Sequence, residues 1–106
     1  MIRCEDIAVR IAAEFFVPLT AMRLARGGET INRAREAYAL AVQCLTSAPD
    51  VSAARALGVP VHLISHLRQS GHKSVAANPI FGARVEEIGR AMLRQDEAAE
   101  RDHVGK

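Results

Sequence analysis

The chain has 106 residues and carries 14 Lys and Arg against 12 Asp and Glu, which gives a formal net charge of +2. This length fits a single domain, and the charge is too small for a histone-like or polybasic protein. No apolar run approaches the ~20 residues of a membrane span, the amino terminus has no signal-peptide pattern, and the two cysteines are 40 positions apart, so the composition argues against membrane, secreted, disulfide-rich and disordered proteins.

The predicted elements are all helical, as expected for a chain with 19 alanines, the residue that favours helix most. Apolar side chains recur at every fourth position in the first helix, over about residues 4–16: Ile7, Ile11 and Phe15. Pro18 ends this helix, because the residue before a proline avoids the helical region, and it opens a short helix over about 18–25. Gly27 and Gly28 then require a loop.

The third predicted helix has the clearest period of the chain. Thr30 caps it, and its apolar positions are Ile31, Ala34, Tyr38, Ala41 or Val42, and Leu45. Asp50 caps the next element, and two short helices are expected on either side of Gly58.

The final helix is predicted to begin at Asn78, an N-cap residue, with Pro79 at the first helical position. We expect its apolar stripe to close the core rather than to form a dimer; the stripe consists of Phe81, Val85, Ile88 and Met92. The polar chain over 97–106 is expected to be frayed, so 1–96 is the predicted domain. No segment shows strand alternation. The predicted fold is therefore all-α, a compact bundle of five to six short helices that contains a helix-turn-helix.

Gly58 lies between two short amphipathic stretches. Their packing positions are Ala53, Ala54 and Leu57 before it and Val59, Ile64 and Leu67 after it. A helix-turn-helix needs a small residue where its helices cross and a turn residue that tolerates the left-handed conformation, and Ala54 and Gly58 meet these needs. A plain helical hairpin with a glycine turn is the alternative. Residues 21–75 carry seven basic and three acidic side chains, which favours the DNA-binding interpretation.

The second helix of this pair, predicted over about 60–69, then reads the major groove of double-stranded DNA. Its outward residues are Val61, His62, Ser65, His66, Arg68 and Gln69. His62 and His66 are four positions apart, which also matches two ligands of a metal site, but no carboxylate or cysteine accompanies them. We therefore expect no metal or other cofactor. We also expect no enzymatic activity, because the chain has no phosphate-binding loop and no nucleophile elbow.

Four segments occur in the order of a known domain. They are Ile11–Val17, Arg33-Ala-Arg35 with the Glu-Ala-Tyr that follows, residues 50–69, and Asn78-Pro-Ile-Phe. In their order and spacing, over about residues 5–93, the chain resembles the C-terminal DNA-binding domain of the bacterial replication initiator DnaA. The resemblance implies a fold similar to that domain and to Trp repressor. It also implies phosphate contacts from Arg26, Arg33 and Arg35.

The expected recognition residues differ from those of the DnaA family. Members begin the recognition helix with Gly-Gly-Arg-Asp-His-Thr-Thr-Val, whereas this chain has Gly58-Val-Pro-Val-His-Leu-Ile64. The Arg, the Asp and both Thr are missing, and each lost bidentate base contact removes about 1–3 kcal/mol of discrimination. We therefore expect a DnaA-like scaffold that reads a different DNA sequence.

On this basis the first expectation is a small bacterial transcription regulator, similar to the DNA-binding part of activators of phage-like gene transfer agent clusters. A replication-origin regulator and a protein-interaction adaptor that no longer touches DNA are the alternatives. The expected partners are double-stranded DNA and, because one recognition helix makes a small interface, a second copy or a helper DNA-binding protein. Direct contact with RNA polymerase is left open. The expected location is the cytoplasm, at the nucleoid.

Overall fold

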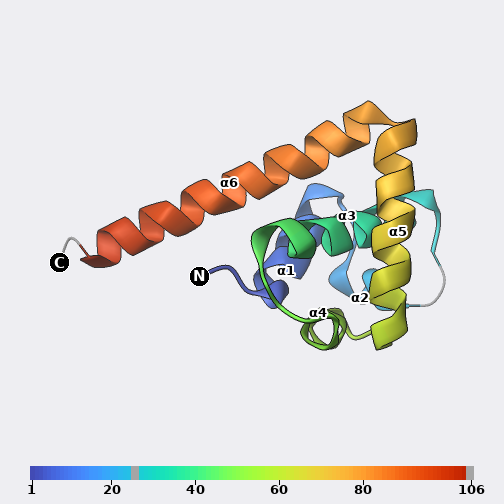
Figure 1. Ribbon diagram of the computed structural model, residues 1–106, viewed down its shortest axis with the longest axis horizontal. Helices are drawn as coiled ribbons and strands as arrows, with labels where there is room; N and C mark the ends of the chain where they lie inside the picture. Colours follow the sequence, from blue (N-terminus) through green and yellow to red (C-terminus); the bar gives the residue numbers. More distant parts are fainter. Residues whose placement is uncertain (25–26, 105–106) are drawn as a thin grey trace.

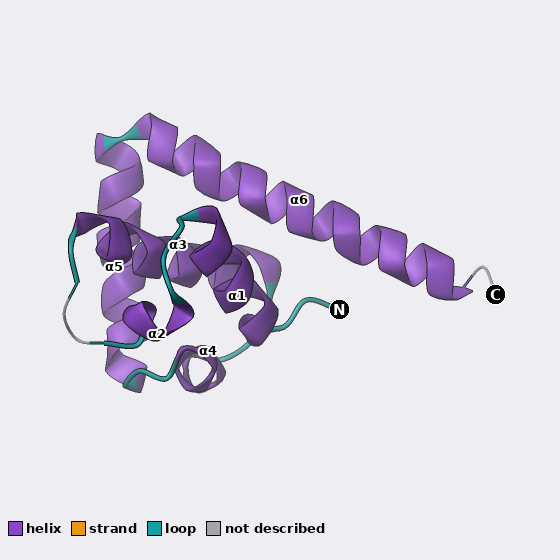
Figure 2. Cartoon of the chain, turned by 180° about the vertical axis from the view of Figure 1, so that it is seen from behind, coloured by secondary structure: helices purple, strands orange, loops and turns teal. Residues whose placement is uncertain are grey.

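The computed structural model describes residues 1–24 and 27–104, with side chains as far as Arg101. Within these ranges the chain forms helices joined by loops, without a strand (Figure 1 and Figure 2). The helices are α1 (Cys4–Glu14), α2 (Leu19–Met22), α3 (Glu29–Leu45), α4 (Asp50–Leu57), α5 (Val61–Ala77) and α6 (Pro79–Val104). The prediction of an all-α fold is confirmed.

Helix α3 lies at the centre of the fold. It contacts α1, α2, α5 and α6, while α4 packs against α1 and α5 (Figure 1). The largest fully buried side chains come from the first five helices: Ile7, Ile11, Met22, Tyr38, Leu57 and Ile64. Burial of one such aliphatic side chain contributes about 1.5–3 kcal/mol. A shared core of this kind fixes the positions of α4 and α5 relative to α3.

Helix α1 ends two residues before its predicted boundary, in a left-handed turn. Phe16 has φ 56° and is 91% exposed. The amide of Val17 donates to the Ala12 carbonyl at 3.0 Å and that of Phe16 to the Ala13 carbonyl at 3.2 Å, which is the Schellman pattern. Glycine is the usual residue at this position, because a side chain in this conformation costs about 1–2 kcal/mol. An exposed phenylalanine therefore occupies a strained position.

The predicted caps of α3 and α4 lie inside the helices. Helix α3 begins at Glu29 after Gly28, so Thr30 is already helical. Helix α4 begins at Asp50 itself. An acidic residue in the first turn of a helix interacts favourably with the helix dipole, so both helices keep a stabilising charge at this end.

Helix α5 continues well past its predicted end at 69, as far as Ala77. The extension passes through Gly71, which is buried against α3: a Cβ at this residue would be 2.9 Å from Leu40 Cγ. Glycine therefore permits a close approach of α5 to α3 instead of breaking the helix. Packing on α3, which no local pattern of the sequence shows, stabilises the last two turns of α5.

Helix α6 begins as predicted, because Asn78 Oδ1 accepts hydrogen bonds from the amides of Ile80 at 3.2 Å and Phe81 at 3.4 Å. Its stripe closes the core, as expected, through the buried residues Phe81, Val85, Ile88 and Met92. The helix continues through residue 97, where the frayed tail is predicted to begin, as far as Val104, and its second half extends away from the other helices (Figure 1). None of the described helices is long and apolar enough to cross a membrane.

Candidate nucleic-acid interface

The turn between α4 and α5 consists of Gly58, Val59 and Pro60. Gly58 has φ 80°, in the left-handed region predicted for it. The amides of Gly58 and Val59 both donate to the Ala54 carbonyl, at 2.8 and 3.0 Å. Pro60 holds the extended backbone from which α5 starts. The two helices are therefore joined by a rigid turn, and five of the six predicted packing residues around it are buried: Ala53, Ala54, Leu57, Ile64 and Leu67. The sixth, Val59, is partly buried against the core.

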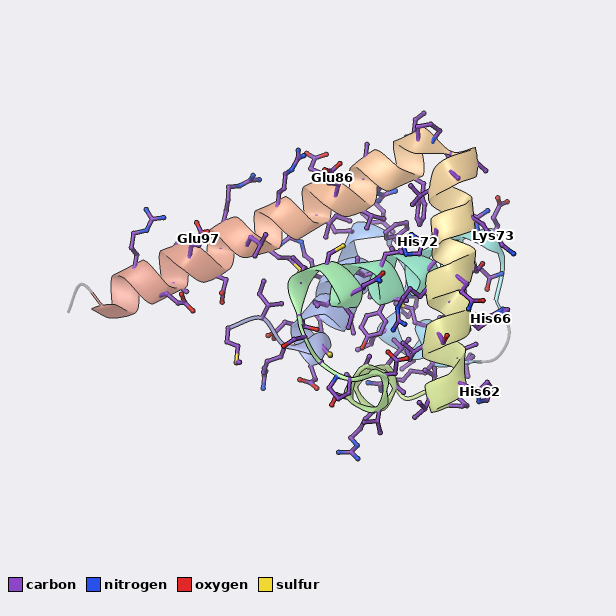
Figure 3. All side chains as sticks on the ribbon, viewed as in Figure 1. His62, His66, His72, Lys73, Glu86 and Glu97 are labelled. Atoms are coloured by element: carbon purple, nitrogen blue, oxygen red, sulfur yellow. The ribbon has the colours of Figure 1, made fainter. Side chains whose placement is uncertain are left out.

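One side of α5 is exposed to solvent. We define this outer face by four exposed residues at positions i, i+4, i+7 and i+11: His62, His66, Gln69 and Lys73. Figure 3 shows His62, His66 and Lys73 on the same side of the helix, with His72 on the other. Helix α5 contains no Asp or Glu. No acidic side chain of the helix therefore repels an anion that approaches the outer face.

A buried carboxylate fixes the side of α5 that faces α3. Glu36 on α3 is 3% exposed. Its Oε1 accepts hydrogen bonds from Arg33 Nη1 and Ser74 Oγ, both at 2.8 Å, and its Oε2 accepts one from Ser70 Oγ. A buried charge is costly unless it is paired and hydrogen-bonded, and these donors meet that condition. The network fixes the rotation of α5 about its axis and so the direction of the outer face.

Arg68, which is predicted to face DNA, makes a contact between α4 and α5. Its Nη2 pairs with the carboxylate of Asp50 at the start of α4, and its side chain is 26% exposed. It is six positions from His62, so it projects about a third of a turn away from the outer face. The ion pair helps to fix the angle between the two helices instead.

Arg35 is also a structural residue, although it is predicted to contact phosphate. It is 5% exposed. Its Nε donates to the Met22 carbonyl at 2.9 Å, its Nη2 to the Ala21 carbonyl at 3.2 Å and its Nη1 to Asn32 Oδ1 at 3.0 Å. The two carbonyls lie at the end of α2, and the Ala21 carbonyl also accepts the amide of Leu24 at 3.3 Å. Burial lowers the pKa of Arg35. Arg26, another predicted phosphate contact, lies outside the described residues.

Arg33 lies at the surface beside α5, but two carboxylates share its charge. Its Nη1 is 2.8 Å from Glu36 and its Nη2 is 3.8 Å from Glu29, and its side chain is 36% exposed. Arg33 and Arg23 line a groove of about 530 Å³ between the start of α3 and α5, which the two histidines of the outer face also line. The groove places arginine directly beside the outer face.

Comparison of the chain with protein-family models, curated proteins and solved structures gives no match. The residues that the structure describes contain no cluster of His, Cys, Asp or Glu that could hold a metal ion. The imidazole, carboxamide and ammonium groups of the outer face suit hydrogen bonds with base edges and phosphates. Val61, which is 46% exposed, and the partly buried Ser65 border the same face. Valine methyl groups can contact the methyl group of thymine.

Three residues of this region are missed by the sequence analysis. Lys73 adds one turn to the outer face, and it could be found by continuing the helical period of His62 past residue 69. Arg23 and Glu36 have no local signal, because Arg23 bonds a carbonyl and Glu36 a serine that each lie 34 positions away in the chain.

Proposed function

We propose that this chain is a sequence-specific double-stranded DNA-binding protein that acts as a small transcription regulator. The observation that supports the proposal is the outer face of α5, which is exposed and free of acidic side chains. Contacts of Glu36 and Asp50 hold the other sides of the helix. In a DNA-binding helix-turn-helix the second helix presents such a face to the major groove, and α4 and α5 would form that pair.

The length and the side chains of the outer face suit a major groove. His62 and Lys73 are eleven positions apart, which is about 16 Å of helix, and the major groove is about 12 Å wide. His62 and His66 then approach base edges while Lys73 reaches a phosphate. Gln69 belongs to the residue type that forms a bidentate contact with adenine. The same face thus combines groups for base reading and for charge neutralisation.

The arginines beside α5 supply the part of the affinity that does not depend on sequence. Arg33 and Arg23 line the groove next to the outer face, and arginine binds phosphate through its planar fork. A single recognition helix makes a small interface. A second copy of the chain or a helper protein then completes a specific complex on neighbouring half-sites.

The proposal is tested by selecting binding sites from random and genomic DNA with the purified protein at near-physiological salt. A sharp motif that differs from the DnaA box is expected, and its genomic positions would identify the regulated genes. Enrichment of the DnaA box would instead assign the protein to replication control. No enrichment at any salt concentration would refute DNA binding and favour a protein-interaction adaptor.

His66→Ala and His72→Ala form a matched pair of variants on one helix. His66 belongs to the outer face, whereas His72 lies on another side of α5, 3.2 Å from Gln43 Oε1 (Figure 3). His66→Ala is expected to weaken binding to the selected site by about 1–3 kcal/mol, with little change for a scrambled duplex. His72→Ala is expected to change neither affinity. Equal losses in the two variants would contradict this orientation of α5.

A further inference from the structure

We propose that Arg23 positions the start of α5 for DNA and adds a phosphate contact to the interface, a role that rests on the proposed function. Arg23 follows α2 as its C-cap residue and belongs to neither α4 nor α5. It is an exposed residue, yet its side chain reaches the turn that joins those two helices. Both parts of the proposal follow from this position.

The side chain of Arg23 is attached to the end of α4. Its Nε donates to the Leu57 carbonyl at 3.0 Å. Leu57 is the last residue of α4, so its carbonyl has no acceptor role inside the helix. A cation at this end also interacts favourably with the dipole of α4. The contact therefore links the end of α2 to the helix that precedes the turn.

The same side chain lies along the turn. A Cβ on Gly58 would be 3.2 Å from Arg23 Cδ and 3.3 Å from Arg23 Nε. Glycine at position 58 thus leaves the space that the arginine occupies, in addition to permitting the positive φ. Helix α5 begins three residues later, at Val61. Any shift of Arg23 therefore acts on the direction in which α5 leaves the turn.

Arg23 is itself held from α3. Arg35 binds the carbonyls of the two residues that precede Arg23, which are Ala21 and Met22. A continuous series of polar contacts therefore leads from α3 through the end of α2 to the turn. These contacts constrain the start of α5 in addition to the apolar core, because hydrogen bonds in a network support one another.

Arg23 also lines the groove beside the outer face, together with His62 and His66. The Nε of Arg23 donates to the Leu57 carbonyl, and among residues 1–24 and 27–104 its two terminal nitrogens have no hydrogen-bond acceptor. The terminal nitrogens of an arginine form the planar fork that a phosphate accepts. One side chain therefore combines control of the turn with a charge at the edge of the proposed interface.

Two substitutions of Arg23 separate these roles. Arg23→Lys keeps the charge but loses the planar fork, so the salt dependence of binding is expected to stay the same while the preference for the selected duplex over a scrambled one falls about tenfold. Arg23→Gln also removes the charge, so the slope of log affinity against log salt is expected to decrease by about one unit. Arg94→Gln, an exposed position on α6, is the control and changes neither quantity.

Circular dichroism and thermal unfolding check that each variant is folded at the assay temperature, as expected for substitutions at exposed residues. An unchanged sequence preference in Arg23→Lys would overturn the positioning role. An unchanged salt slope in Arg23→Gln would overturn the phosphate contact. If the unaltered protein prefers no duplex over another, the proposed function itself fails. If only the Arg23 inference is wrong, the unaltered protein keeps its preference.

Discussion

Replacement of Gly71 by alanine is expected to destabilise the protein, although alanine is the better helix residue. In a helix interior alanine is favoured over glycine by about 0.8–1.0 kcal/mol. At this residue, however, the added Cβ would lie 2.9 Å from Leu40 Cγ, 3.0 Å from Cδ1 and 3.3 Å from Cδ2. These atoms belong to the buried side chain of Leu40, so either this side chain or α5 itself must shift to admit the methyl group.

The magnitude follows from these opposing effects. Overpacking of a well-packed core costs about 1–3 kcal/mol. With the gain in helix propensity subtracted, the net loss is about 1 kcal/mol. Gly89→Ala is the matched control, because its Cβ would be 3.7 Å from Leu45 Cδ2, an ordinary van der Waals contact. That variant keeps the propensity gain without the clash, so it is expected to be more stable than the unaltered protein by about 0.8 kcal/mol.

Thermal unfolding of the two variants provides the assay. A change of 1 kcal/mol shifts the Tm of a domain of this size by about 4 °C. Gly71→Ala should therefore unfold about 4 °C below the unaltered protein, and Gly89→Ala a few degrees above it. If Gly71→Ala is stabilised as much as Gly89→Ala, the close approach of α5 to α3 is refuted, and with it the orientation of the outer face.

Two further predictions concern single side chains. Phe16→Gly relieves the left-handed strain at the end of α1 and should raise the free energy of unfolding by about 1 kcal/mol, so an unchanged Tm would argue against that turn. Tyr38→Phe loses the 2.6 Å hydrogen bond to the Ala53 carbonyl and should lower the free energy of unfolding by about 1 kcal/mol. Burial raises the pKa of Tyr38 above its ordinary value of 10.0. Its contribution to the free energy of unfolding is therefore complete below pH 10.0 and is lost as the pH rises further. Tyr38 is the one tyrosine of the chain, so phenolate absorbance should appear together with alkaline unfolding; its appearance in the folded protein would contradict this burial.

The helices with a strong apolar period could be predicted from the sequence, because apolar residues at helical spacing form one face that is buried only if the segment is helical. The end of α5 could not be predicted in this way, because residues 70–74 read Ser-Gly-His-Lys-Ser and contain no large apolar side chain. Here the helix is stabilised by the approach of Gly71 to Leu40 and by the hydrogen bonds of two serines to Glu36. Both contacts depend on α3, which is distant in the sequence.

The exposed histidines of α5 could be placed by periodicity, but the roles of the arginines could not. The sequence identifies an arginine but does not show which acceptor its guanidinium binds in the fold. Arg35 bonds carbonyls 13 and 14 positions away, and Arg68 pairs with a carboxylate 18 positions away. Both are predicted to face DNA, and both lie in contacts between helices. Arg23 reaches its acceptor across 34 positions, so only the fold reveals it.

Helix α6 is continuous in shape, but its two halves form for different reasons. Helix formation requires a costly nucleus, because the first turn fixes several residues for one hydrogen bond. Packing of Phe81 to Met92 supplies that nucleus, whereas residues 97–101 are all exposed. The outer segment is too short to form a helix in isolation, so it propagates from the packed part. On warming we expect it to unwind gradually from Val104 inwards, so its amide hydrogens should exchange with solvent before those of the first half, which are protected until the whole protein unfolds.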